Sequence, residues 1–298
     1  MPALNMDFNM NMDFNMNMGT AGSSVGGNGT RARFNTEDYR KYVPVGAVVI
    51  PANPSVMRFP AYWDPELRAY EYLNALVIQY PNWRTLLQAD VGTAIGPPNL
   101  TSPHTMSSAA LTNQIIDLLD RSPDRPDRFN EIVGQHTGEG AIGYFLGMLM
   151  IDPARMPAIH LLMRVARRLG EHVAMCLKGE FRCPRPSQLC SAIVPMIDPP
   201  ATPSFPSGHS LQAALMARCL EATSPPMRPL SLLNDLALRI GENRIIAGLH
   251  FKQDHEIGYA IGRWIYSKLL DPLGANTPFK KLETAAKTEM ANQWAAQP

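Results

Sequence analysis

The amino-acid sequence predicts an all-α protein. Apolar residues recur every three or four positions through most of the chain, which is the spacing of one face of a helix. Stretches rich in proline and glycine interrupt these runs and divide them into segments of helical length. Hydrophobic residues make up 45% of the 298 residues and charged residues 18%, so the chain can bury a large core.

The chain divides into a tail, a helical domain and a last helix. The stretch Met6–Asn11 is repeated at once as residues 12–17, and glycine, serine and threonine dominate the residues that follow. Residues 1–33 are therefore predicted to be a disordered, low-complexity tail, because this composition cannot bury a core. Residues 34–274 form the predicted helical domain, and residues 275–298 a C-terminal helix on the surface or against a partner chain.

The first part of the helical domain begins irregularly and continues with short helices. Leu67, Leu73 and Leu76 recur at helical spacing, and Pro81 ends this helix. Pro126 can open a later helix, because the first turn needs no N–H donor. The predicted helices of this part cover residues 61–80, 83–89, 107–121 and 126–135, with another beginning near Glu139.

The second part contains the longest predicted helix and a proline-rich connection. An apolar stripe predicts a helix over residues 157–178, with Arg164, Arg167 and Arg168 on its solvated face. Residues 184–205 are rich in proline and are predicted to be a connecting loop. The remaining predicted helices cover residues 207–223, 230–246, 252–270 and 277–294.

Three short polar blocks are the candidates for chemistry. The first runs from Lys178 to Pro186, with Arg185 just before its last residue, and the second is the run Pro206-Ser-Gly-His209. The third begins at Asn243 and ends at Asp254. Each block lies at a predicted helix end or in the proline-rich loop, so the blocks can meet at one place in the fold.

A tetrahedral oxyanion such as phosphate explains these residue types together. Arg185 and Arg244 can each grip two oxygens, and Lys178 adds a point charge. Ser207 and Gly208 fall at a predicted helix start, where free backbone N–H groups and the helix dipole favour an anion.

The two histidines of the blocks then have separate tasks. Asp254 follows His250 by one helical turn, so its carboxylate can hold one ring nitrogen and leave the other free to attack. His209 is left to give a proton to the leaving oxygen.

The blocks resemble the signature of one superfamily. It joins type 2 phosphatidic acid phosphatases, bacterial non-specific acid phosphatases and vanadium-dependent haloperoxidases, and its pattern is K-x6-R-P, then P-S-G-H, then S-R-x5-H-x3-D. The sequence matches it in order, over roughly residues 140–270, except that Asn243 stands where the pattern has serine. An asparagine can still hydrogen-bond, so the substitution affects a supporting contact more than the mechanism.

The resemblance implies a fold and a set of roles. The implied fold is an antiparallel helical bundle of the acid phosphatase/haloperoxidase type, with the site at one end of the core. In the phosphatases the last histidine attacks phosphorus without a metal or other cofactor, and water hydrolyses the phosphohistidine. In the haloperoxidases the same histidine binds vanadate, and peroxide oxidises halide there. The implied catalytic residues are His250, His209 and Asp254, and the phosphate- or vanadate-binding residues are Lys178, Arg185, Ser207, Gly208 and Arg244.

The sequence favours the phosphatase, and two alternatives stay open. The blocks follow one another closely, as in the soluble acid phosphatases, and Thr202 stands where well-studied haloperoxidases have histidine or phenylalanine. The first alternative is a vanadium-dependent haloperoxidase acting on peroxide and halide. The second is a non-catalytic phosphate-binding or interaction module, which the intact reactive positions disfavour. The expected partner of the phosphatase is a small phosphorylated substrate, and a homo-oligomer stays open.

Composition and pattern argue against several other classes. The net charge of +1 does not indicate nucleic-acid binding. The four cysteines show no zinc-site spacing and are expected to be reduced. We expect no membrane span and no secretory leader, and hence a cytoplasmic protein. The stretch from His136 to Gly140 is interpreted as an ordinary turn and helix start rather than a substrate-side loop, and His255 is expected to be exposed.

Overall fold

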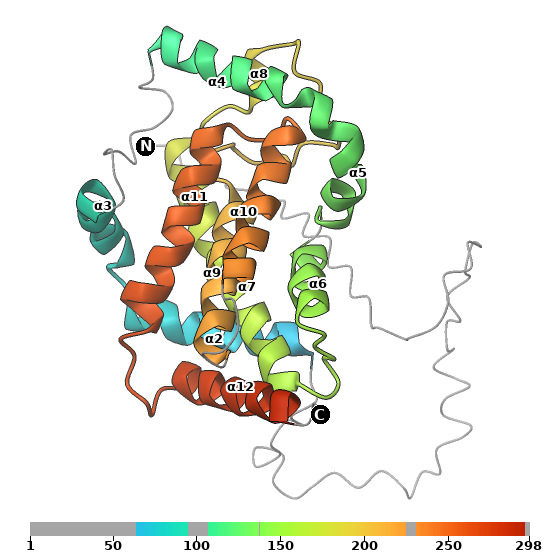
Figure 1. Cartoon of the computed structure of the whole chain (residues 1–298). Coiled ribbons are helices and arrows are strands. Elements are labelled where there is room, and N and C mark those ends of the chain that lie inside the picture. The colour runs from blue at the N-terminus through green and yellow to red at the C-terminus, as the bar shows by residue number, and fades with distance from the viewer. Residues whose placement is uncertain (1–63, 95–106, 137, 225–230, 296–298) are drawn as a thin grey trace, which may run out of the picture. The chain divides into compact units, whose positions relative to one another are not determined.

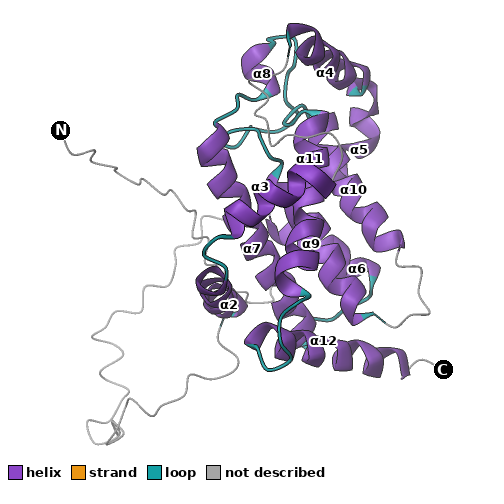
Figure 2. Cartoon of the chain, turned by 90° about the vertical axis from the view of Figure 1, so that its left-hand side faces the viewer, coloured by secondary structure: helices purple, strands orange, loops and turns teal. Residues whose placement is uncertain are grey.

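The computed structural model describes residues 64–94, 107–136, 138–224 and 231–295. These residues are helical or irregular and include no strand, which confirms the predicted all-α class (Figures 1 and 2). The predicted tail over residues 1–33 and the irregular segment that follows it lie outside the described residues.

Prolines and short polar residues set the starts of several helices. Pro65 occupies the first turn of its helix, and the Asp64 side chain accepts a hydrogen bond from the Glu66 N–H, so the helix begins later than predicted. The N-terminal helices are α2 (Pro65–Gln79), α3 (Trp83–Ala94), α4 (Ser108–Asp120), η4 (Ser122–Asp124), α5 (Arg125–Gly134) and α6 (Gly138–Met148). The C-terminal helices are α7 (Pro157–Phe181), α8 (Pro186–Leu189), α9 (Gly208–Thr223), α10 (Ser231–Ile246), α11 (Lys252–Trp264), the π-helical η5 (Ile265–Leu270) and α12 (Pro278–Ala295).

Helix α9 is the central element of the core. It contacts α7, α10, α11 and α12, and both views place it among α7, α10 and α11 (Figures 1 and 2). Its residues are buried on nearly every side, as expected for a helix surrounded by other helices. The start of α9 is therefore a fixed point on which polar side chains can be placed accurately.

Helix α11 packs directly on the backbone of α9. A Cβ atom at Gly258 would lie 2.6 Å from the Ser207 carbonyl oxygen, and one at Gly262 would lie 2.3 Å from the Leu211 carbonyl oxygen. Only glycine allows such an approach of two backbones. The close contact brings the first turn of α11, which carries Asp254, against the start of α9.

The C-terminal helix α12 is a packed part of the core and not only a surface helix. Its apolar face contacts α7 and α9, although its other face is exposed. The buried side chains of this face are Phe279, Leu282, Ala286 and Met290. Helix α12 lies at one end of the bundle, whereas α4, α5 and α8 lie at the other end (Figures 1 and 2).

A cluster of ion pairs joins α2 to α7. The arginines expected on a solvated face instead surround Glu66, which pairs with Arg164, Arg167 and Arg168. Arg167 is only 8% exposed, so this face of α7 is covered by α2. Burial alone would raise the pKa of Glu66, but the charge of Arg167 and hydrogen bonds from the three arginines lower it to about 2.

Replacing Glu66 with glutamine is expected to destabilise the fold in a pH-dependent way. A carboxyl whose pKa is depressed on folding stabilises the fold above its unfolded pKa, and this contribution is lost as the pH falls toward the folded value. The free energy of unfolding of Glu66→Gln should be about 2 kcal/mol below wild type at pH 7, after a discount for solvent screening. Urea unfolding at pH 7 and at pH 3 measures the difference, which should shrink at pH 3; an equal difference at both pH values would contradict the ion-pair account.

Candidate active site

The eight predicted site residues lie at helix ends and in the loops between them. Lys178 is in the last turn of α7, Ser207 and Gly208 begin α9, and Arg244 is in the last turn of α10. Asp254 is in the first turn of α11, so four core helices contribute to one end of the bundle. The remaining site residues are Arg185, which precedes α8, His209 in α9, and His250, which precedes α11.

His250 is the centre of this group. Its Nδ1 atom lies 3.3 Å from Asp254 Oδ2 and 3.3 Å from Ser204 Oγ, and its Nε2 atom lies 3.5 Å from Arg185 Nη1. A carboxylate can only accept, so the proton belongs on Nδ1 and the lone pair on Nε2. Burial, followed by the charges of Lys178, Arg185 and Arg244, lowers the pKa of His250 well below its usual value. The imidazole is therefore neutral.

Asp254 is fully buried and anchors the loop before α11. Its Oδ2 atom accepts hydrogen bonds from the Phe251 N–H at 3.0 Å and from the Ser204 hydroxyl, and its backbone carbonyl accepts from the Ser207 N–H at 3.0 Å. Burial raises the pKa of Asp254, against these hydrogen bonds and the nearby cations. Its Oδ1 atom has no partner among the described residues. Asp254 thus holds both the histidine and the start of α9.

Lys178 and Arg185 carry buried charges that are held by neutral groups. Lys178 Nζ donates to the carbonyls of Pro203 and Ser204. Arg185 donates to the carbonyls of Thr202 and Leu249, and both of these distances are 2.9 Å. Burial lowers the pKa of Lys178, and the charge of Arg185 lowers it further. Carbonyl groups orient these cations without neutralising them, so both remain available to an anion.

Arg244 is fully buried and only partly satisfied. Its Nη2 atom donates to the Ile132 carbonyl of α5 at 2.8 Å, whereas Nε and Nη1 have no partner among the described residues. Burial lowers its pKa to about 10, so the guanidinium is charged at neutral pH. An unpaired buried donor costs about 1–3 kcal/mol, and more when it is charged. An oxyanion beside Arg244 could accept from both of these N–H groups.

The start of α9 forms the more open side of the site. The Ser207 hydroxyl accepts from Ser210 and is buried, whereas Gly208 and His209 are partly exposed. His209 Nε2 lies 3.0 Å from the Gln135 carbonyl oxygen, which places a proton on Nε2 and leaves Nδ1 as the acceptor. Burial, Arg244 and His250, in that order, lower the pKa of His209 to about 3. His209 is neutral at physiological pH unless an anion joins the site.

Sequence reasoning missed two residues of this arrangement. Ser204 touches both His250 and Asp254, and it lies only three residues before Ser207 in the second block. Gln135 touches His209 and Asn243, and it directly precedes the stretch that was interpreted as an ordinary turn. His255, expected to be exposed, is partly buried, and its Nδ1 atom lies 2.9 Å from Ser210 Oγ.

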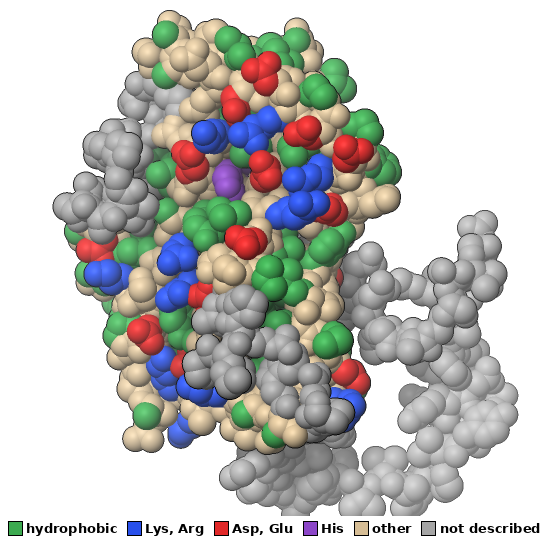
Figure 3. Space-filling view, viewed as in Figure 1, with side chains coloured by type: hydrophobic (Ala, Val, Ile, Leu, Met, Phe, Trp, Pro, Cys, Tyr) green, Lys and Arg blue, Asp and Glu red, His purple; other side chains and the backbone are tan. Residues whose placement is uncertain are grey.

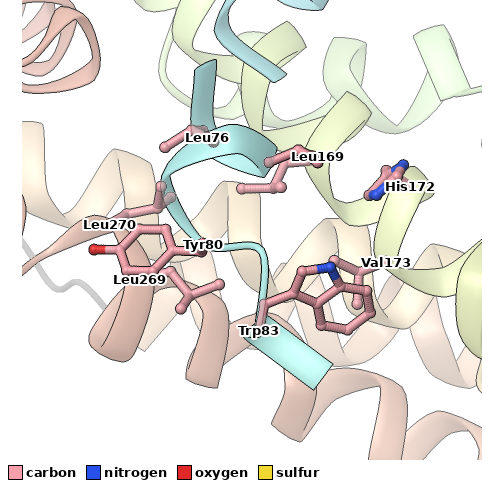
Figure 4. A pocket seen from close by; sticks show the side chains of 9 residues that line it. Leu76, Tyr80, Trp83, Leu169, His172, Val173, Leu269 and Leu270 are labelled. Carbon is pink, nitrogen blue, oxygen red and sulfur yellow. The ribbon is translucent and has the colours of Figure 1, made fainter. Parts of the chain in front are cut away.

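An apolar hollow lies elsewhere in the fold. Leu76, Trp83, Leu169 and Leu270 are among the side chains around it, and Figure 4 shows the His172 ring at its edge. Its cavity volume of about 10 Å³ is barely enough for one water molecule. The hollow is thus a packing defect, and the chemically equipped group is the one around His250.

Three other classes of site find no support among the described residues. No group of three or more histidine, cysteine, aspartate or glutamate side chains among them could hold a metal ion. No helix among them is both long and apolar enough to cross a bilayer. On the described part of the face drawn in Figure 3, basic and acidic side chains are interspersed, which does not favour a polyanion.

Comparison with known proteins supports a phosphatase. No family model matches the chain. The chain is 29% identical over 155 residues to decaprenylphosphoryl-5-phosphoribose phosphatase of Mycobacterium tuberculosis, in the strains CDC 1551 / Oshkosh and ATCC 25618 / H37Rv. The aligned region covers 51% of this chain and 83% of each relative. This similarity supports an enzyme that hydrolyses phosphate esters.

Proposed function

We propose that the chain is a metal-independent phosphoric-ester hydrolase that works through a phosphohistidine at His250, in the superfamily that its polar blocks resemble. The observation that carries the proposal is the charge arrangement around His250. Three buried cations surround a neutral imidazole, and the carboxylate in contact with that imidazole belongs to Asp254. The phosphatase named in the comparison supports the same reaction class.

The charges of the site favour a dianion. Arg185 and Arg244 are cationic, and Lys178, whose pKa burial lowers to about 7, becomes fully charged beside an anion. With Asp254 ionised, the three cations then leave an excess of two positive charges. A phosphate monoester at neutral pH carries close to two negative charges and has three terminal oxygens for the donors. Such an anion would also give partners to the unpaired N–H groups of Arg244. The site therefore suits a phosphate monoester better than a neutral or singly charged ligand.

Each side chain of the site has a role in the proposed reaction. The His250 Nε2 lone pair attacks phosphorus while the bond from phosphorus to the ester oxygen breaks. His209 gives the leaving oxygen a proton from Nδ1, because the bound dianion offsets Arg244 and raises the pKa of His209. Lys178, Arg185 and Arg244 stabilise the charge on the three phosphoryl oxygens. Water then attacks phosphorus, gives a proton back to His209, and releases phosphate and a free His250.

Assays on the wild-type protein test the reaction class. We expect hydrolysis of p-nitrophenyl phosphate in buffer with a metal chelator, and competitive inhibition by orthovanadate, which has the same four-oxygen shape. Because the name of the relatives specifies a phosphoribose substrate, a phosphoribose compound is the first class of natural substrate to assay. Halide oxidation by peroxide after vanadate loading, without phosphatase activity, would replace the proposal with a haloperoxidase. If the protein shows neither activity, the non-catalytic binding module is the alternative that remains.

A further inference from the structure

The C-terminal end of α5 reaches the same site from a fifth helix. The Ile132 carbonyl accepts a hydrogen bond from Arg244, and the Gln135 carbonyl accepts one from His209. Ile132 and Gln135, the residue that caps α5, are about one turn apart and therefore lie on one face of the helix end. Gln135 is fully buried, which is unusual for glutamine, and its backbone carbonyl contacts the site residue His209.

A chain of hydrogen bonds fixes which way the Gln135 amide points. Arg128 donates to Asn243 Oδ1 at 3.3 Å, and Asn243 Nδ2 donates to Glu131 Oε2 at 3.0 Å. Arginine can only donate and an ionised carboxylate can only accept, so the Asn243 amide has one possible orientation. Asn243 Nδ2 also lies 2.9 Å from Gln135, and the facing atom must be the oxygen Oε1. The Gln135 nitrogen is thereby turned away from Asn243.

That nitrogen is a buried donor without a partner among the described residues, as are Nε and Nη1 of Arg244. Buried donors are normally hydrogen-bonded, so each exception has room for an acceptor that the described side chains do not supply. Both donors lie where the end of α5 meets the last turn of α10, because Gln135 accepts from Asn243 and Arg244 donates to Ile132. A phosphoryl oxygen beside Arg244 is an acceptor of the required kind.

We propose that Gln135 is a further substrate-binding residue, whose side-chain N–H donates to a phosphoryl oxygen of the substrate on the side of Arg244. The inference rests on the proposed function and adds a neutral donor to its cationic site. It also explains Asn243 at the position where the resembled pattern has serine. A serine hydroxyl has one proton and could not donate to Glu131 and Gln135 at once, whereas the asparagine amide has two.

Anion binding by two Gln135 variants tests the inference. Gln135→Met keeps the approximate shape but removes the donor, together with the acceptor for Asn243, and orthovanadate and phosphate should bind about 10-fold more weakly, the usual effect of losing one hydrogen bond to a charged group. Gln135→Glu keeps the acceptor for Asn243 but turns a carboxylate oxygen toward the anion, and should weaken binding by about 100-fold. Titration calorimetry measures the anion affinity of both variants. If Gln135→Met does not fold, the affinity of Gln135→Glu alone tests the inference.

A stability measurement separates ligand binding from a structural role. The melting temperature of Gln135→Met without anion should fall, because the buried Asn243 amide loses the acceptor that Gln135 supplies, and the further rise caused by orthovanadate should be smaller than in wild type. Gln293→Met in α12 is the matched control, because its Oε1 atom also lacks a partner among the described residues, and its anion affinity should be unchanged. If both Gln135 variants bind the anions as tightly as wild type, the role of Gln135 is overturned but the proposed function is not. Failure of wild type to bind orthovanadate or hydrolyse phosphate esters would overturn the proposed function as well.

Discussion

Replacing His250 with alanine is expected to lower phosphatase turnover by at least about 1,000-fold, because the attacking atom is lost and water must attack the ester directly. His250 Nε2 is suited to attack because Nδ1 is held by Asp254 and Ser204. Burial and the surrounding cations lower the pKa of the ring, which favours its neutral, attacking form. Initial rates on p-nitrophenyl phosphate measure the loss, and rapid quenching with radiolabelled substrate should trap a phosphoenzyme only in wild type.

His172→Ala is the matched control for this experiment. His172 is a half-buried histidine of α7 that borders the small apolar hollow and contacts Cys176, away from the polar blocks. Its replacement should leave the rate and the phosphoenzyme unchanged. A His250→Ala protein that keeps a tenth of the wild-type rate, or still forms phosphoenzyme, would show that another residue is the nucleophile.

The helices and the polar blocks were predictable because both depend on local signals. Ser207 caps α9 through its own side chain, and Pro157 opens α7, so each boundary can be read from a few neighbouring residues. The pair of His250 and Asp254 is likewise one helical turn apart. The structure brings these residues together, and their catalytic roles stay predictions until rates are measured.

The supporting contacts could not be predicted, because they join residues far apart in the chain. Gln135 meets Asn243 and His209, and neither pair leaves a periodic signal that marks a glutamine as buried. The arginines of α7 have the spacing of a solvated face, and only the packing of α2 against them reveals Glu66 as their partner. Hydrophobic periodicity identifies a polar face but does not show whether another helix covers it.

Replacing Arg244 is expected to have the second large effect, on the affinity for anions. Arg244→Met is expected to weaken orthovanadate binding by about 100-fold or more, since two charge-assisted hydrogen bonds to the anion are lost. The same change should leave the protein without anion at least as stable as wild type. Methionine removes a buried charge that has one hydrogen-bond partner among the described residues, and replacing such a charge by an apolar side chain is often neutral or stabilising. Calorimetric titration and melting temperatures measure the two effects.

The electrostatics of Arg244→Met give an independent readout. Arg244 is one of the charges that lower the pKa values of His209 and His250, so its removal should raise both, and NMR titration of the histidine rings follows the change. Arg218→Met, on the C-terminal half of α9, removes the same charge where it pairs with Glu221 and should alter neither the histidine pKa values nor orthovanadate affinity. Unchanged affinity in Arg244→Met, or a marked loss of stability without anion, would mean that Arg244 supports the fold through Ile132 rather than binding the substrate. Because ligand binding and structural support predict opposite changes in these two quantities, the single substitution decides between them.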